Sequence, residues 1–170
     1  MSQGLPDSVD AWRMVQARRH FAGTLALAKL SRLAADLASS EGTAQFDLEF
    51  GTDELGVAYL HVRAQAGLPL ACQRSLETFV FPVAIDTRLG LITKEADEAA
   101  LPPNYEPLLT SDGVLRLADV VEDELILALP LVPVKPGTEA IERSWGDAEP
   151  DVEETPPNPF AALKTLKDAN

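Results

Sequence analysis

Three arginines near the N-terminus are the side chains of this sequence best suited to contact phosphate. Arg13, Arg18 and Arg19 lie within residues 1–40, which hold five basic side chains against three acidic ones, although the chain of 170 residues has a net charge of −13. Arginine and lysine supply most protein contacts with nucleic acid phosphates. The cluster is therefore a candidate RNA contact, and helix capping or pairing with the acidic half of the chain explains it equally well.

A second candidate is the alternation of an aromatic and two basic side chains along one predicted strand. Tyr59, His61 and Arg63 share one face of that strand, which should pair with the strand that carries Asp47 and Glu49. One interpretation is a platform that stacks unpaired RNA bases. The other is cross-strand charge pairing, worth a few tenths to about 1 kcal/mol per pair. We favour charge pairing, because few of these groups are able to stack.

The second half of the chain is strongly acidic, and three of its acids are consecutive. Residues 95–154 hold sixteen acids against three bases, so the chain as a whole repels phosphate backbones. Glu122, Asp123 and Glu124 lie in a predicted helix, where consecutive side chains point about 100° apart and cannot chelate one metal ion by themselves. A solvated helix face is the favoured interpretation, with recognition of a basic partner as the alternative.

Common catalytic motifs are absent from the sequence. It contains no GxSxG, P-loop, GxGxxG or HExxH pattern, so we expect no enzymatic activity, no cofactor and no metal. The histidines are more simply explained as exposed or hydrogen-bonded strand residues than as catalytic bases. Cys72 is the only cysteine, the N-terminal residues resemble no signal peptide, and the longest apolar run is too short to span a bilayer. We therefore expect a cytoplasmic protein with no membrane contact.

Alternating apolar residues predict strands in the first half of the chain. Phenylalanine and leucine alternate with polar side chains over residues 45–50, a pattern typical of a half-buried strand. Gly67 is expected to turn the chain, and Pro69 and Pro82 indicate edge positions or bulges. The predicted fold is α+β, with a twisted antiparallel β-meander from about residue 18 to 85 packed against two or three helices.

Helical periodicity and composition predict the remaining organisation. Helices are expected over about residues 7–18, with Asp7 or Ser8 as N-cap, over residues 27–38 and over residues 116–129. A small hairpin is expected around residues 111–113. Residues 1–135 are predicted to form a single domain, followed by an acidic, proline-containing linker over residues 136–157 that we expect to be a disordered arm.

The last residues, 158–170, carry a short helix motif. Asn158 suits the N-cap, Pro159 suits the first helical position, and apolar residues follow at a spacing of three. So short a helix is marginal alone in water, so we expect it to fold against a surface. A partner protein is the favoured surface, and the chain's own domain is the alternative. The motif comprises Asn158, Pro159, Phe160, Leu163, Leu166 and Lys167.

Four segments taken together carry a family resemblance. The segment VEDELILALPLVPV, residues 121–134, matches a helix–proline signature, and Cys72 and Arg74 match the first part of a CxRC segment. The N-terminal residues fall at the spacing of a helix followed by a strand, and the tail matches an NPFaxLxxLK pattern. In these features the chain resembles the YceD family, named for large ribosomal RNA subunit accumulation. Ser75 departs from the pattern, because it replaces the second cysteine.

The resemblance implies a bacterial cytoplasmic factor needed for normal levels of 23S ribosomal RNA, with no enzymatic activity attached to the name. Because Ser75 removes the only paired thiol, we expect no bound zinc, and we expect Cys72 to be a small buried residue in a strand. The expected function is a non-enzymatic ribosome-biogenesis factor. Its acidic half would bind a large-subunit ribosomal protein or assembly factor, and its basic head would contact the 23S precursor. A direct RNA-binding protein and an uncharacterised enzyme are the alternatives, and the oligomeric state stays open.

Overall fold

The computed structural model describes residues 5–110 and 112–138. The predicted linker therefore lies outside the described residues except for residues 136–138, and the predicted tail helix, residues 158–170, lies wholly outside them. The elements in chain order are β1 (Val9–Asp10), α1 (Ala11–Gln16), β2 (His20–Ala26), η1 (Leu27–Lys29), α2 (Ser31–Asp36), β3 (Thr43–Thr52), β4 (Ala58–Ala71), β5 (Thr78–Ile92), η2 (Glu95–Ala100), β6 (Glu106–Leu109), β7 (Val114–Leu115) and α3 (Leu117–Leu127).

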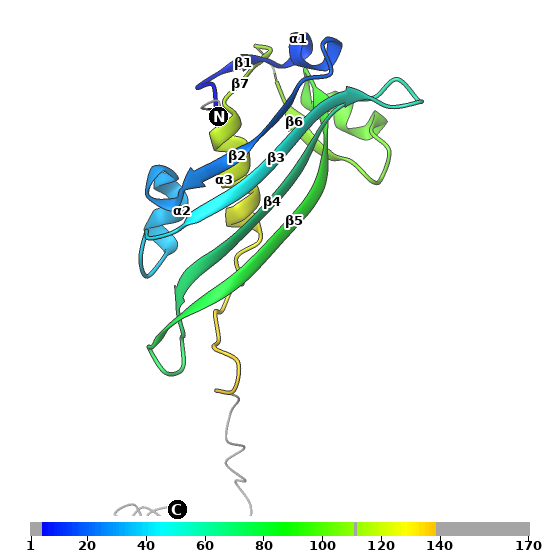
Figure 1. Ribbon diagram of the computed structural model, residues 1–170. Helices are drawn as coiled ribbons and strands as arrows, with labels where there is room; N and C mark the ends of the chain where they lie inside the picture. The colour runs from blue at the N-terminus through cyan, green and yellow to red at the C-terminus, as the bar shows by residue number, and fades with distance from the viewer. Residues whose placement is uncertain (1–4, 111, 139–170) are drawn as a thin grey trace, which may run out of the picture. The chain divides into compact units, whose positions relative to one another are not determined.

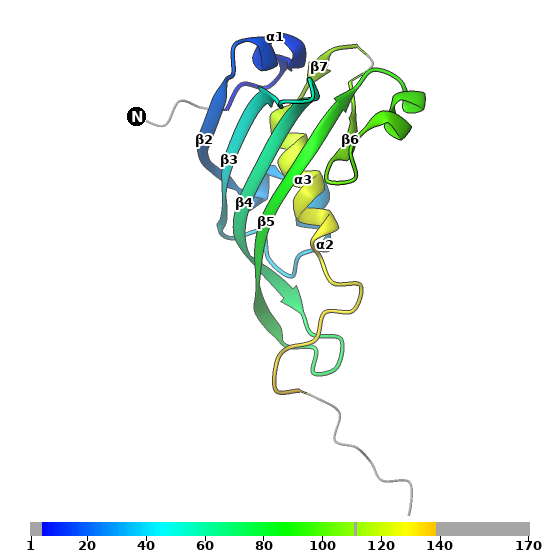
Figure 2. The same ribbon diagram turned by 90° about the vertical axis from the view of Figure 1, so that its right-hand side faces the viewer.

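A five-stranded mixed sheet organises the described residues. Its order is β2-β3-β4-β5-β6, in which β2 to β5 form an antiparallel meander and β6 runs parallel to β5. A separate two-stranded sheet pairs β1 with β7. The helix α3 lies behind the large sheet in Figure 1, and Figure 2 shows it against one face only. The predicted α+β fold with an antiparallel meander is confirmed, and the parallel strand β6 is an addition to it.

The core lies between the sheet and α3. The alternation predicted for β3 buries Phe46, Leu48 and Phe50 on one face, and β4 contributes a matching alternation. From the helix side, Leu117, Val120, Val121 and Leu125 are buried, as the periodicity predicted. A fully buried leucine or phenylalanine contributes about 1.5–3 kcal/mol, so this apolar layer is the main reason that the sheet and α3 hold together.

Both strand prolines lie where the strand has a strand partner on one side only. Pro69 lies beyond the part of β4 that β3 pairs, because the β3–β4 register ends at Ala66. Pro82 lies in β5 before the segment that β6 pairs, which begins at Leu89. Proline has no N–H to donate, so such one-sided positions tolerate it, and the predicted edge location is confirmed. The turn predicted at Gly67 is wrong, because β4 continues through this residue to Ala71.

Three further predictions are corrected by the structure. The hairpin around residues 111–113 does not form, because β6 pairs with β5 and β7 pairs with β1. The first helix is capped by Asp10, which accepts a hydrogen bond from the Arg13 N–H at 2.9 Å, rather than by Asp7 or Ser8. The second predicted helix is divided into η1 and the shorter α2. The hairpin and the expected cap position give way to strand pairing that local patterns do not encode, and the second helix is interrupted at Leu30, whose ψ of 82° is not helical.

Candidate functional site

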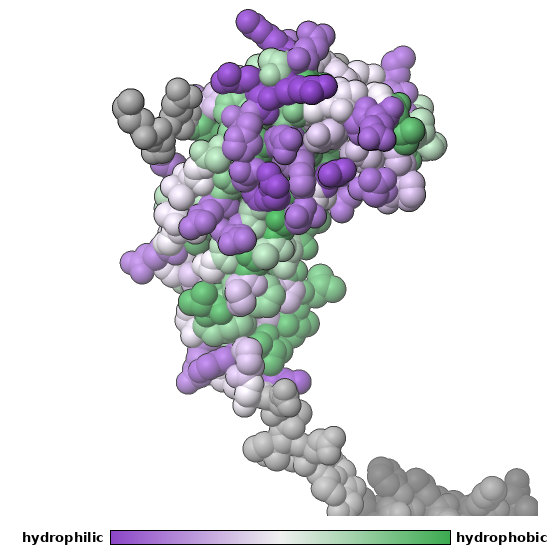
Figure 3. All heavy atoms as spheres, turned by 45° about the vertical axis from the view of Figure 1, so that its right-hand side comes forward, coloured by the Kyte–Doolittle hydropathy of each residue, from purple (hydrophilic) through white to green (hydrophobic). Residues whose placement is uncertain are grey.

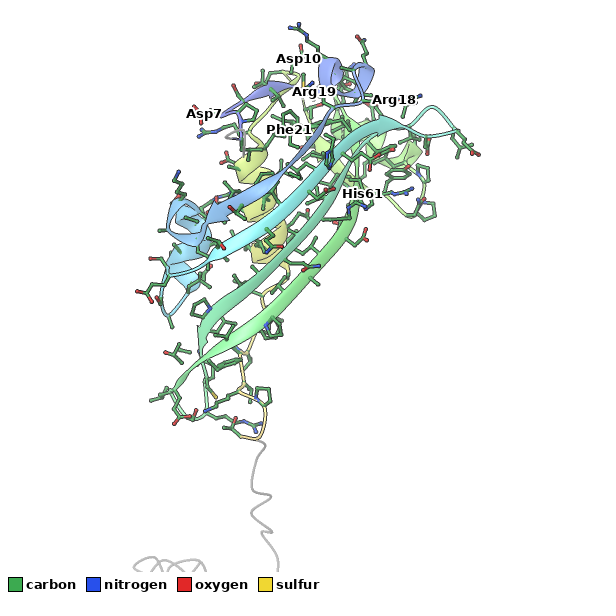
Figure 4. The ribbon with its side chains drawn as sticks, viewed as in Figure 1. Asp7, Asp10, Arg18, Arg19, Phe21 and His61 are labelled. Carbon is green, nitrogen blue, oxygen red and sulfur yellow. The ribbon has the colours of Figure 1, made fainter. Side chains whose placement is uncertain are left out.

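The sheet face opposite α3 carries a network of paired charges. His20 Nε2 lies 2.7 Å from Asp47 Oδ2, and Arg63 Nη2 lies 2.6 Å from Asp47 Oδ1. His61, labelled in Figure 4, lies with its Nε2 2.6 Å from Asp86 Oδ1. These side chains come from β2, β3, β4 and β5 and bridge adjacent strands. The arrangement is the cross-strand charge pairing that one interpretation of the sequence proposed.

The same network explains the ionisation of its carboxylates. Burial raises the pKa of Asp47, but the hydrogen bonds from Arg63 and His20 outweigh it and leave the pKa below its ordinary value. The hydrogen bond from His61 lowers the pKa of Asp86. Both carboxylates therefore remain charged and hold the basic side chains in place. The side chain of His61 is only 13% exposed, which leaves little of its ring for stacking a base.

Tyr59 lies at one end of this face, in a separate cluster. Its ring centroid is 6.3 Å from that of Tyr105, and the Arg88 guanidinium lies 5.8 Å from the Tyr59 centroid. The Tyr105 hydroxyl donates to Asp53 Oδ2 at 3.0 Å. These groups line a hollow of about 420 Å³. The predicted platform residues Tyr59, His61 and Arg63 thus lie on one strand but contact different neighbours.

The N-terminal arginines gather at the α1 end of the sheet. Figure 4 shows Arg18 and Arg19 beside the helix that Asp10 caps. The Arg19 guanidinium lies 5.7 Å from the centroid of Phe21, a weak cation–π contact. Arg18 has a positive φ of 46°, which marks the turn between α1 and β2. Within residues 5–110 and 112–138, neither these two arginines nor Arg13 forms an ion pair, so their charges face solvent at this end.

The three consecutive acids of α3 have three different environments. Glu122 is buried and accepts hydrogen bonds from the Arg32 N–H at 2.7 Å and the Leu33 N–H at 3.1 Å. The Arg32 guanidinium binds Glu122 Oε2 at 2.9 Å through Nη2 and also binds the exposed Asp123. The predicted solvated face is therefore wrong for Glu122 and Glu124, because the helix turns Glu122 toward α2 and Glu124 toward β5. Only Asp123 faces solvent.

Glu124 lines a groove beside strand β5. The side chain is 8% exposed, and burial together with the charge of Glu106 raises its pKa, outweighing a hydrogen bond from the Thr87 side chain that lowers it. The groove has a volume of about 520 Å³, and its lining includes three carboxylates and no cation; of the three, Asp86 is paired with His61. Its lining residues are Ala84, Ile85, Asp86, Thr87, Glu106, Glu124, Leu127 and Ala128.

The motif residues Cys72 and Arg74 lie in the turn that joins β4 to β5. Cys72 is fully buried, and its Sγ accepts hydrogen bonds from the Lys135 N–H at 3.4 Å and the Ser75 N–H at 3.5 Å. These bonds lower the pKa of Cys72 to about 6. The Arg74 guanidinium donates to the Thr138 carbonyl at 3.0 Å. The hydrogen bonds of Cys72 and Arg74 therefore connect the segment after α3 to this turn. Cys72 was expected within a strand, but it lies just after β4, which ends at Ala71.

No metal-binding group and no membrane-spanning helix occurs in the described part of the chain. Within residues 5–110 and 112–138, no three or more histidine, cysteine, aspartate or glutamate side chains gather as metal ligands would. No helix in that part is long and apolar enough to cross a membrane. The tail residues Asn158 to Lys167 lie outside it.

Sequence reasoning missed Arg32 and the groove beside Glu124. Both depend on contacts between residues that lie far apart in the sequence, and no local pattern indicates such contacts.

Comparison with known proteins identifies relatives. The family model described as "Large ribosomal RNA subunit accumulation protein YceD" matches residues 60–167. A Haemophilus influenzae protein named large ribosomal RNA subunit accumulation protein YceD is 33% identical over 168 residues, which cover 96% of each chain. No solved structure matches. The resemblance found in the sequence motifs is confirmed.

Proposed function

Because the chain belongs to the YceD family of large ribosomal RNA subunit accumulation proteins, we propose that it supports the accumulation of 23S ribosomal RNA as a non-enzymatic assembly factor. It acts in the cytoplasm by binding a basic large-subunit ribosomal protein or assembly factor. A secondary contact with precursor RNA accompanies this binding. The family name supplies the process, and the charges and contacts of this chain support the mode of action.

The observation that carries the proposal is that basic and acidic side chains without ion-pair partners lie in different parts of the molecule. Arg13, Arg18 and Arg19 are free of ion pairs in the described part of the chain and gather at the α1 end. The chain nonetheless has a net charge of −13, and two acids of the groove beside β5, Glu106 and Glu124, have no cation among the lining residues. An acidic surface of this kind attracts basic proteins and accelerates their association.

The contact with RNA is assigned to the arginine cluster rather than to the sheet face. On that face, Arg63 and His61 are held by Asp47 and Asp86, so a base or phosphate would have to displace carboxylates. The cluster requires no such displacement. A contact of a few arginines gives modest affinity that falls steeply with salt. It would orient the protein on a precursor particle rather than hold it there.

A capture experiment tests the proposal. The tagged full chain is incubated with large-subunit precursor particles at low and high salt, with and without ribonuclease. We expect a basic large-subunit protein to be retained after ribonuclease treatment and to be lost at high salt, because the attraction is electrostatic. Capture that depends wholly on intact RNA would contradict the protein-binding proposal and favour a direct RNA-binding protein.

The RNA contact is tested with matched charge reversals. The variant with Arg13→Glu and Arg18→Glu is compared with one that carries Lys29→Glu and Lys94→Glu, two exposed cations away from the cluster. Both variants change the net charge equally. We expect only the arginine variant to co-sediment less with precursor particles, by about tenfold. Equal losses in both would show that net charge alone governs the association.

A further inference from the structure

The exposed edge of β5 extends well beyond the strand that covers its end. β6 pairs only with Leu89–Ile92, whereas β4 pairs with β5 as far as Thr78. Residues 78–88 therefore have a strand neighbour on one side only. Figure 2 shows β6 beside the upper part of β5 alone. Such an edge presents unpaired backbone N–H and C=O groups that accept a further strand.

The longest stretch of this open edge without a proline lies next to the acidic groove. Pro82 lacks an N–H and interrupts any added ladder at its own position. The stretch from Val83 to Arg88 contains no proline, and Ala84–Thr87 line the groove together with Glu106 and Glu124. An added strand beside this stretch would continue the line of β6 and run directly past both glutamates.

An apolar surface borders the same groove. Leu127 is 73% exposed although it lines the groove, and Leu131 is fully exposed beyond the end of α3. In Figure 3, hydrophobic residues gather on the lower part of the described surface, whereas the upper part is largely hydrophilic. Apolar side chains beside an open strand edge supply contacts for alternate residues of an added strand.

We propose that the β5 edge over residues 83–88 and the adjacent groove bind a basic, extended segment of a partner protein as an added strand. Backbone hydrogen bonds to β5 hold the segment. Its lysines or arginines, which share the α3 side of the added strand, contact Glu106 and Glu124 with their charged ends and pack on Leu127 with their methylene chains. A second copy of this chain is a poor occupant because each copy carries a net charge of −13. The inference rests on the proposed function and locates the site at which the basic partner binds.

The raised pKa of Glu124 supports this occupant. The carboxylate is buried beside another acid, and its charged form is disfavoured as long as no cation is near. A lysine or arginine of the added strand would neutralise both glutamates at once. The groove would then gain a charge pairing that its own lining residues do not supply.

A fluorescent peptide of alternating lysine and valine is the probe, with binding to the full chain followed by anisotropy. Two further versions carry N-methyl groups on one or the other alternate set of amides. A strand directs alternate amides to opposite neighbours, so methylation of one set should abolish binding while methylation of the other leaves it unchanged. Hydrogen exchange should slow, when the unmodified peptide binds, at those β5 amides of residues 83–88 that face away from β4. Equal binding of both methylated peptides would overturn the added-strand geometry.

Side-chain variants with matched controls test the groove. We expect Leu127→Asn to weaken peptide binding about tenfold, whereas Leu55→Asn, at an equally exposed leucine in the β3–β4 turn, leaves it unchanged. Glu106→Lys should weaken binding by a similar factor, and Glu98→Lys, at an exposed acid in η2, should have little effect. Equal effects of the groove and control variants would overturn the placement.

The outcomes separate failure of this placement from failure of the proposed function. If Leu127→Asn and Glu106→Lys leave capture of a basic large-subunit protein from precursor particles intact, the proposed function stands and the β5 site is overturned. If the chain sediments alone as a dimer that Leu127→Asn dissociates, the edge belongs to a second copy and the placement is likewise overturned. Loss of both peptide binding and particle capture in the groove variants, but not in the controls, supports the placement.

Discussion

On the side of α3 that faces α2, Glu122 accepts hydrogen bonds from two backbone N–H groups and from the Arg32 guanidinium. On the side that faces β5, Glu124 is almost as buried, at 8% exposed against 4%, but the groove around it contains Glu106 and no cation. The two glutamates are two residues apart on one helix. Their difference therefore comes from what packs against each side of α3.

The comparison teaches that burial of an acid has opposite consequences in the two places. A buried carboxylate with N–H donors and a guanidinium ties two elements together, and removal of it leaves those donors without an acceptor. A buried carboxylate beside another acid favours the protonated form, and a bound cation would stabilise the charged form instead. The α2 side is thus structural, and the β5 side is the one suited to binding.

Among the substitutions that test this comparison, Glu122→Ala is expected to reduce the stability of the protein most. The Arg32 and Leu33 N–H groups and the Arg32 side chain lose their common acceptor. Removal of such an acceptor from a buried site costs about 3 kcal/mol. We expect the urea unfolding midpoint to fall accordingly, with an unchanged dependence of the unfolding free energy on urea concentration.

The control for this prediction is Asp123→Ala. Asp123 contacts the same guanidinium but is exposed and accepts no backbone N–H. Solvent-exposed ion pairs contribute little, so we expect almost no change in the unfolding midpoint. If Asp123→Ala and Glu122→Ala destabilised the protein equally, the guanidinium rather than the backbone donors would account for the stability of the α2 side.

A smaller effect is expected at the other buried acceptor, Cys72, which Lys135 and Ser75 bind through their N–H groups. These bonds lower the pKa of the folded-state thiol from 9.0 to about 6. The thiolate therefore contributes stability that is fully present above the unfolded pKa and is lost as pH falls through about 6. We expect the stability difference between the wild type and Cys72→Ser to grow from pH 6 to pH 9, as measured by urea unfolding.

The thiolate itself gives an independent measurement of that prediction. Its ultraviolet absorbance in the folded chain should appear as pH rises through about 6, well before that of the unfolded chain. Parallel stability curves for the wild type and Cys72→Ser over the same pH range would show that the turn is held by Arg74, Lys135 and Glu77 without help from the thiolate.

Local patterns in the sequence predict much of the fold but little of this comparison. The alternation over residues 45–50 identifies β3, and the periodicity of Leu117, Val121 and Leu125 identifies α3, because period alone determines which face is apolar. The partner of Glu122 lies 90 residues away at Arg32. A run of three acids carries no information about such a distant neighbour, so a uniform solvated face was expected.

The parallel pairing of β6 was beyond prediction for the same reason. Residues 106–115 suggest a local hairpin, yet the Thr110 N–H donates to the Ile92 carbonyl at 2.8 Å and directs the chain along β5. The open edge of β5 and its acidic groove result from this non-local pairing. The candidate binding site could therefore be recognised only once the strand order was known.

The smallest expected effect, and the one that most sharpens the comparison, is that of Glu124→Gln. Burial and the charge of Glu106 raise the pKa of Glu124 above its ordinary value of 4.5. As pH rises through 4.5, the unfolded chain ionises first, so the wild type loses stability that the neutral glutamine variant keeps.

Urea unfolding at a series of pH values measures this effect. The two chains should be equally stable in acid, and Glu124→Gln should be slightly more stable at neutral pH, in contrast to the marked destabilisation expected for Glu122→Ala. Addition of the lysine–valine peptide should reverse the order, because a bound cation stabilises only the wild-type carboxylate. A variant that is less stable than the wild type at neutral pH without peptide would mean that Glu124, like Glu122, has a neutralising partner within the chain.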